Sequence, residues 1–196
     1  MKQEEIELLL ETTGAIRHGH FQLSSGLHSA LYVQCALLFE HPAHAARLAD
    51  ALADRFADMQ IDVVAAPALG GIILGYELAR QFGARSVFVE RDATGRFALR
   101  RFALAPGERV LVAEDVLTTG ASARETMEVV RQEGGEVVGV AAIMDRSGSR
   151  LDFRVPLRTL LTKKIETYAP EECPLCREGH PLEKPGSRPE NKEARK

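Results

Sequence analysis

The stretch from Val110 to Ser122 constrains the fold of this chain more than any other part of the sequence. It begins with a run of β-branched and apolar residues, which predicts a buried strand, and it ends in a turn of small residues that opens a helical pattern. Two adjacent carboxylates, Glu114 and Asp115, stand between the strand and the turn. The sequence therefore predicts a strand–turn–helix unit of the kind from which α/β proteins are built.

The turn, which runs from Thr118 to Ser122, is suited to holding a phosphate group. Backbone N–H groups at the start of a helix lack partners within it, and the helix dipole adds positive potential there. The upstream carboxylates would repel a phosphate, but they can accept hydrogen bonds from the hydroxyls of a ribose. Glu125, three residues after Ser122, completes a capping-box pattern that predicts Ser122 as the N-cap. The pattern indicates a sugar phosphate ligand, although an ordinary strand–loop–helix junction would also explain it.

These residues resemble the phosphoribosyl-diphosphate (PRPP) signature of the type I phosphoribosyltransferases. The resemblance implies that Glu114 and Asp115 are catalytic and hold the ribose. It also implies that PRPP contacts the whole stretch, namely Glu114, Asp115, Val116, Leu117, Thr118, Thr119, Gly120, Ala121 and Ser122.

A second turn, at Gly70-Gly71, lies between a predicted strand over 61–66 and a predicted helix over 72–82. In the family this turn holds the diphosphate of PRPP, and two glycines would let backbone N–H groups approach it closely. A glycine turn with a purely structural role is the alternative, because every strand-to-helix connection needs a turn.

The segment from Gly19 to Gln34 is predicted to form two short extended pieces around residues 24–26. It resembles the N-terminal hood of orotate phosphoribosyltransferases, whose pattern is matched by Phe21, Leu23, Ser25, Gly26, Ser29 and Tyr32. The segment departs from the family in two places: Ser24 stands where many members have a lysine, and Tyr32-Val33 stands where some have two aromatic residues against the pyrimidine. A plain β-hairpin without a binding role is the alternative.

A strongly β-branched strand over 136–144 is predicted to deliver Arg146 to the carboxyl edge of the sheet, where ligands of parallel sheets collect. In the orotate family this arginine pairs with the carboxylate of orotate, and a planar guanidinium suits that partner. The alternative is a surface ion pair with Asp145 or Asp152. The resemblance thus implies an orotate site formed by Thr118, Arg146, Tyr32 and Ser24.

Residues 91–101 correspond to the mobile catalytic loop of the family, which is offered across a dimer interface. The usual loop carries two lysines and a histidine, and neither type occurs between Glu90 and Arg109. Arg91 matches one lysine position by its spacing and is the expected catalytic residue of the loop. Further candidates are Arg96, Arg100 and Arg101, and the pattern resembles a divergent, Thermus-type bacterial branch. Ordinary surface arginines on a solvated hairpin are the alternative.

The C-terminal part contains Cys173, Cys176 and His180, which suggest half of a zinc site. A closed structural zinc site needs four ligands and this segment offers three, so no protein metal ligand is firmly assigned. A small turn with two reduced thiols is the competing interpretation. The residues from Pro181 onward are rich in proline, glycine and charge and are interpreted as a flexible tail.

Alternating strand and helix patterns predict an α/β fold with a mainly parallel sheet and helices on both faces, plus a small N-terminal hood. We expect residues 1–168 to form the phosphoribosyltransferase domain, with the hood largely at 14–40. Residues 169–196 are then a cysteine-containing extension and flexible tail.

The resemblance implies transfer of the phosphoribosyl group of PRPP to orotate, giving orotidine 5′-phosphate and diphosphate in pyrimidine biosynthesis, with Mg²⁺ as cofactor. It also implies a homodimer that shares loop 91–101. Two alternatives remain: a purine phosphoribosyltransferase with the same PRPP turn, and a non-catalytic PRPP-sensing transcriptional regulator. A net charge of −3 argues against a nucleic-acid partner. Because no apolar run has membrane-spanning length and the N-terminus reads as an acidic helix start, we expect a cytoplasmic protein without a membrane partner.

Overall fold

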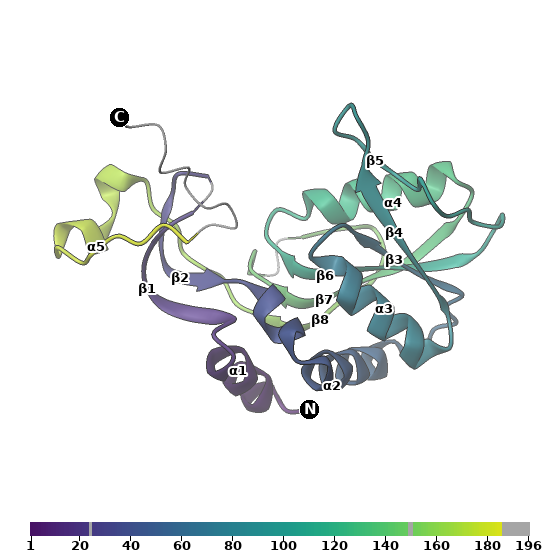
Figure 1. Ribbon diagram of the computed structural model, residues 1–196, viewed down its shortest axis with the longest axis horizontal. Coiled ribbons are helices and arrows are strands. Elements are labelled where there is room, and N and C mark those ends of the chain that lie inside the picture. The colour runs from purple at the N-terminus through teal and green to yellow at the C-terminus, as the bar shows by residue number, and fades with distance from the viewer. Residues whose placement is uncertain (24, 149–150, 186–196) are drawn as a thin grey trace, which may run out of the picture.

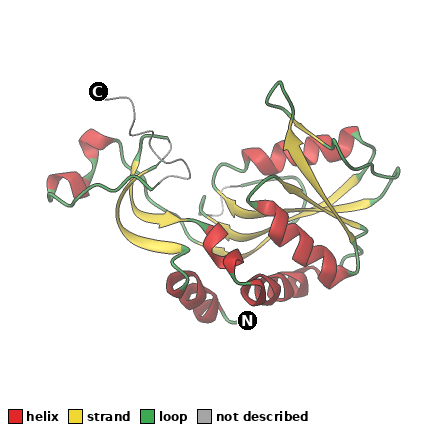
Figure 2. Cartoon of the chain, in the orientation of Figure 1, coloured by secondary structure: helices red, strands yellow, loops and turns green. Residues whose placement is uncertain are grey.

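The computed structural model describes residues 1–23, 25–148 and 151–185. Its centre is a six-stranded sheet in the order β5-β4-β3-β6-β7-β8 (Figures 1 and 2). Its strands are β3 (Val63–Pro67), β4 (Arg85–Arg91), β5 (Phe97–Ala98), β6 (Arg109–Leu117), β7 (Glu136–Asp145) and β8 (Leu157–Thr162). Every neighbouring pair is parallel except β4 with β5. The predicted α/β class with a mainly parallel sheet is confirmed.

Helices cover both faces of this sheet (Figure 1). One face carries α2 (Pro42–Ala53) and α3 (Gly71–Phe82), with α1 (Gln3–Thr12) against the β8 edge, and the other carries α4 (Ala121–Gln132). Apolar residues three and four apart give each helix a buried stripe, for example Leu74 and Leu78 in α3 and Met127 and Val130 in α4. Because both faces are covered, all five residues of β3 are buried, as is usual for a central parallel strand.

The hood is a separate antiparallel pair, β1 (Ile16–Gln22) with β2 (His28–Val33), and it stands beyond the carboxyl edge of the main sheet (Figure 1). The chain joins it to α2 through η1 (Cys35–Glu40), and η2 (Asp54–Phe56) follows α2. The end of the described chain returns to the hood through η3 (Pro170–Glu172) and α5 (Pro174–Arg177).

The start of the segment interpreted as a flexible tail lies against β1. The N–H of Gln22 donates to the carbonyl oxygen of Glu183 at 2.8 Å. The N–H of Glu183 donates to the carbonyl oxygen of His20, also at 2.8 Å. Residues 186–196 of that tail lie outside the described residues.

β5, the edge strand that pairs antiparallel with β4, contains Phe97 and Ala98 alone. Beyond it the chain turns, and the guanidinium of Arg101 lies 2.9 Å from the carboxylate of Glu90. Among the described helices, none is both long and apolar enough to cross a membrane.

Candidate active site

The four turns that follow β3, β6, β7 and β8 lie at one edge of the sheet, because the strands that precede them are parallel. The predicted PRPP turn follows β6 and leads into α4. Gly120 is the N-cap of α4 and adopts a left-handed backbone with φ of 72°. A Cβ atom at this position would lie 2.9 Å from the ring of Phe153. Both the conformation and the space therefore require glycine.

The predicted capping box is wrong. Ser122 lies within the first turn of α4 rather than at the N-cap, and no side chain of the N-cap residue caps the helix. The carboxylate of Glu125 instead lies 3.1 Å from Arg91, and the Ala121 N–H donates to the Thr119 hydroxyl at 3.3 Å. The remaining N–H groups of the turn thus stay available to a ligand.

The two carboxylates point to opposite sides of β6, as neighbouring residues of a strand do. Glu114 accepts hydrogen bonds from the Ser122 hydroxyl and the Ala123 N–H, at the start of α4. Asp115 faces the other predicted PRPP turn, since a Cβ on Gly70 would lie 3.0 Å from its Oδ2. The structure therefore brings the β3–α3 and β6–α4 turns together around the acidic pair, as the sequence predicted.

Burial changes the protonation of this pair. Desolvation, followed by the charge of Asp115, raises the pKa of Glu114 to about 7, although its hydrogen bonds from Ser122 and Ala123 act in the opposite direction. Desolvation also raises the pKa of Asp115, against a hydrogen bond from the Val116 N–H at 2.8 Å. A ligand that donates hydroxyl hydrogen bonds would favour the ionised form of both groups.

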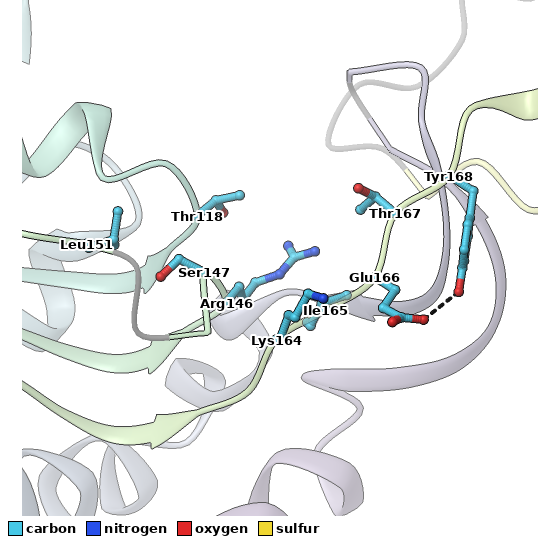
Figure 3. A pocket seen from close by; sticks show the side chains of 9 residues that line it. All are labelled: Thr118, Arg146, Ser147, Leu151, Lys164, Ile165, Glu166, Thr167 and Tyr168. Atoms are coloured by element: carbon cyan, nitrogen blue, oxygen red, sulfur yellow. Dashed lines mark hydrogen bonds between the residues drawn. The ribbon is translucent and has the colours of Figure 1, made fainter.

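Two cavities with volumes of about 540 Å³ and 750 Å³ open between this sheet edge and the hood. They share Thr118 and Arg146 from the sheet side, and both reach Ile165 and Thr167 after β8 (Figure 3). The larger cavity also reaches the hood residues Leu23, Ser25, Leu27, Tyr32 and Val33. Tyr32 therefore lies where the sequence predicted, whereas Ser24 lies outside the described residues.

The side chain of Arg146 extends into the cavity between Thr118 and Thr167 (Figure 3). Its Nε is buried and has no hydrogen-bond partner in the described part of the chain, and desolvation lowers the pKa of the guanidinium. The alternative partner Asp152 pairs with Arg154 at 3.2 Å. A half-buried, incompletely paired cation that faces a cavity is suited to binding an anion.

Sequence reasoning missed the lining residues that follow β8. Lys164, Ile165 and Thr167 line the cavities, and Lys164 adds a second cationic side chain near Arg146. A signal was present, because residues that follow a parallel strand collect at the ligand edge of the sheet.

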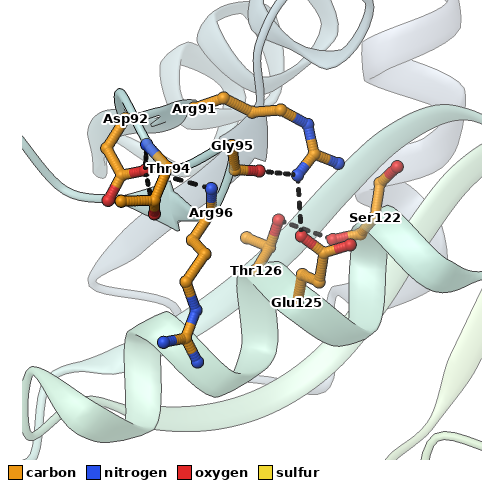
Figure 4. A network of polar contacts seen from close by, with 8 residues as sticks. All are labelled: Arg91, Asp92, Thr94, Gly95, Arg96, Ser122, Glu125 and Thr126. Atoms are coloured by element: carbon orange, nitrogen blue, oxygen red, sulfur yellow. Dashed lines mark hydrogen bonds and ion pairs between the residues drawn. The ribbon is translucent and has the colours of Figure 1, made fainter.

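The structure does not bring the loop arginines into the cavities. Nη1 of Arg91 lies 3.1 Å from the carboxylate of Glu125 of α4 (Figure 4). The Arg91 guanidinium also lies 4.1 Å from the centre of the Phe97 ring. Arg100 and Arg101 both pair with Glu90. The tip of the loop is ordered by Asp92, whose carboxylate accepts hydrogen bonds from Thr94 and Arg96 (Figure 4).

Comparison with known proteins decides the family. The phosphoribosyl transferase domain family matches residues 36–168. Orotate phosphoribosyltransferase of Caldicellulosiruptor bescii is 54% identical over 96% of this chain and 99% of the relative. That of Thermotoga maritima is 50% identical over 93% of this chain and 98% of the relative. The chain belongs to the orotate phosphoribosyltransferase family. The predicted family, enzyme class and reaction are confirmed: the chain is a transferase that moves a phosphoribosyl group to orotate.

Solved structures show that the fold alone would not have separated the orotate enzymes from their purine relatives. The orotate phosphoribosyltransferase of Aeropyrum pernix has a TM-score of 0.66 at 26% identity, covering 80% of this chain and 93% of that one. The adenine phosphoribosyltransferase of Rhodothermus marinus has a TM-score of 0.61 at 27% identity, covering 80% of this chain and 99% of that one. The two base classes share this architecture, so base choice must reside in particular side chains.

Proposed function

We propose that the orotate phosphoribosyltransferase reaction of this chain takes place between the sheet edge and the hood, with PRPP on the two turns and orotate beside Arg146. The observation that carries this assignment is the half-buried Arg146 guanidinium, whose buried Nε has no partner in the described chain and which extends into a cavity next to the Thr118 end of the phosphate turn. A Mycobacterium tuberculosis orotate phosphoribosyltransferase solved with PRPP has a TM-score of 0.65 at 27% identity, covering 82% of this chain and 95% of that one. This similarity supports a PRPP site here.

The acidic pair is assigned to the ribose. As the diphosphate leaves, positive charge grows on the ring carbon and oxygen of the ribose. Carboxylates at Glu114 and Asp115 would hold the ribose hydroxyls and place negative potential near that charge. The nucleophile is a ring nitrogen of orotate, so the reaction needs no serine or cysteine nucleophile.

The turn at Gly70-Gly71 is assigned to the diphosphate. A side chain on Gly70 would meet Asp115, and one on Gly71 would lie 3.0 Å from the carbonyl oxygen of Ala113. The absence of side chains lets this turn lie against β6, and its backbone N–H groups can then approach an anion.

Magnesium is the expected cofactor. Asp115 offers a hard oxygen ligand that faces the diphosphate turn, which fits the preference of Mg²⁺ for carboxylates together with substrate phosphates. When bound, the ion would neutralise charge on the departing diphosphate.

A base panel tests the proposed function. With PRPP and Mg²⁺ present, orotate is expected to be consumed with diphosphate release, while adenine, hypoxanthine, xanthine and uracil react at least about a hundredfold more slowly. A hundredfold difference in rate corresponds to about 2.7 kcal/mol, which is roughly the free energy that one buried charge-assisted hydrogen bond contributes. Preferred use of a purine base would contradict the assignment of the base site.

The homodimer and the shared loop 91–101 stay predictions, and so does the cytoplasmic location. In the described chain Arg91 pairs with Glu125 and lies away from the cavities, so a role in catalysis requires the loop to act elsewhere. A neighbouring subunit's site is the place that the family resemblance implies.

Arg91→Ala is expected to lower turnover by about tenfold to a hundredfold while changing PRPP affinity by less than about threefold, because the residue would act mainly on the leaving group. Arg131→Ala is the matched control, since Arg131 also pairs with an exposed carboxylate of α4, that of Glu128. Wild-type turnover in Arg91→Ala would transfer the role to another arginine.

Sharing of the loop has its own test in mixed dimers. Co-expression of Arg91→Ala chains with Arg146→Ala chains would create one complete site in each mixed dimer if the loop acts across a twofold interface. Activity near a quarter of the wild-type value is then expected from random pairing. No recovery above the two parent variants would show that the loop serves its own chain.

A further inference from the structure

Four potential metal ligands from three separate segments meet in the hood. His20 lies on β1, His28 lies on β2, and Cys173 and Cys176 flank the start of α5. Their ligand atoms all lie within 4.8 Å of one another. We propose that these four side chains bind one structural zinc ion, which fixes the C-terminal segment to the hood.

The spacing of the ligand atoms fits a single tetrahedral ion. His20 Nε2 lies 3.5 Å from Cys173 Sγ and 3.6 Å from Cys176 Sγ, and His28 Nδ1 lies 3.3 Å from Cys176 Sγ. Zinc bonds of about 2.0–2.1 Å to nitrogen and about 2.3 Å to sulfur imply nitrogen–sulfur edges of about 3.5 Å in a tetrahedron. The two ring nitrogens are 3.0 Å apart, slightly closer than the edge of about 3.3 Å that the same bonds imply.

The tautomer of His20 is suited to a metal. Its Nδ1 lies 2.9 Å from the backbone carbonyl oxygen of His180, which can only accept a hydrogen bond. Nδ1 therefore carries the proton, and the lone pair of Nε2 faces the other three ligands. A hydrogen bond from the second ring nitrogen to a carbonyl is the usual way in which a metal-bound histidine is oriented.

The ligand set differs from the one that the sequence suggested. The cluster does not include His180, whose exposed ring lies 3.2 Å from the carboxylate of Glu178. His180 contributes its carbonyl to the orientation of His20 instead. Cys173 and Cys176 are in the cluster as predicted, and the two histidines of the hood supply the missing ligands.

The donor set and its compactness select zinc among common metals. Two thiolates and two imidazoles form a closed tetrahedral set that is typical of structural zinc, and they leave no position for substrate. A two-iron cluster with two histidines and two cysteines places the histidines on one iron and the cysteines on the other. That arrangement needs more separation than the sulfur–nitrogen distances of 3.3–3.6 Å. The cysteines are not joined in a disulfide either.

A zinc ion here would supply stability that the hood lacks. A two-stranded hairpin is at best marginally stable by itself, and α5 is four residues long. The metal would join β1 and β2 to the segment that also pairs with them through Tyr168 and Glu183. Because Leu23 and Tyr32 of the hood line the larger cavity, the ion would fix one wall of the base site without touching substrate.

The zinc content of the purified protein tests this proposal directly. The full-length protein, purified without chelator and analysed by inductively coupled plasma mass spectrometry, is expected to contain about one zinc per chain. Cys176→Ser and His28→Ala are each expected to lose most of it, whereas His180→Ala is the matched control and should retain it. Equal loss in His180→Ala would overturn the ligand assignment.

Cobalt substitution covers the case in which the ligand variants fail to fold. Wild-type protein grown with Co²⁺ should show the intense visible bands of a tetrahedral ion and a thiolate-to-cobalt band in the near ultraviolet. Wild-type protein that contains no metal and acquires neither band would refute the site. Both readouts are independent of transferase activity, so they test the zinc site separately from the proposed catalytic roles.

Discussion

Replacing Arg146 by alanine is expected to lower kcat/KM for orotate by roughly a hundredfold to a thousandfold. The guanidinium extends into the cavity, its Nε is buried without a partner in the described structure, and burial lowers its pKa. Removal of one partner from a buried, hydrogen-bonded charge pair costs about 2–5 kcal/mol, because the other charge is left without compensation. A tenfold change in rate corresponds to about 1.4 kcal/mol, so a hundredfold to thousandfold loss corresponds to about 2.7–4.1 kcal/mol, which lies inside that cost.

Uracil provides a substrate control in the same experiment, since it lacks the carboxylate that Arg146 is assigned to bind. The slow reaction of uracil should change by less than about threefold in Arg146→Ala, so that the preference for orotate over uracil collapses. Arg146→Lys should recover part of the loss, because an ammonium keeps the charge but not the two-pronged geometry. Unchanged kcat/KM for orotate in Arg146→Ala would remove this residue from the base site.

Local patterns were sufficient to predict the mainly parallel sheet and the strand–turn–helix unit over residues 110–122. The apolar run at Val110–Ala113 and the turn at Thr118–Ser122 specify a buried strand followed by a helix, and β6 and α4 lie there. The parallel arrangement then brings the Gly70 turn and the acidic pair together, which chain order and strand pairing already implied.

Contacts between distant segments account for the predictions that were wrong or incomplete. Ser122 with Glu125 matched a capping box, but α4 begins after Gly120, which has a left-handed backbone and lies too close to the Phe153 ring for a side chain. No local pattern around Ser122 contains that constraint. The same reasoning applies to Arg91, whose partner Glu125 lies 34 positions along the chain.

The four-residue metal cluster also depends on contacts between distant segments, which local sequence patterns do not reveal. Cys173 and Cys176 were visible as a pair, and His180 was the nearest histidine in sequence. His20 and His28 join the cysteines only because the antiparallel register of β1 and β2 places the two rings 4.9 Å apart. The return of the C-terminal segment to the hood, through the bridge between His28 and Tyr168, then brings the cysteines beside them. Neither step follows from composition or spacing.

Gly120→Ala is expected to weaken PRPP binding by about tenfold to a hundredfold, measured by isothermal titration calorimetry with Mg²⁺. The native φ of 72° costs an alanine about 1–2 kcal/mol, and its Cβ would lie 2.9 Å from the buried ring of Phe153. The turn must therefore shift, and the N–H groups that it offers to the phosphate shift with it. Loss of one such charge-assisted hydrogen bond costs about 1.5–3 kcal/mol, which sets the expected range.

Gly83→Ala separates this geometric effect from simple backbone strain. Gly83 also has a positive φ, of 64°, but a Cβ there would meet no atom within 4 Å, and the residue ends α3 at its C-terminus. This variant should lose thermal stability from strain alone while keeping its PRPP affinity within about twofold. If Gly120→Ala also kept wild-type affinity, the bend after β6 could not be the phosphate site, because its N–H groups cannot stay in place while Phe153 and a new methyl group occupy the same space.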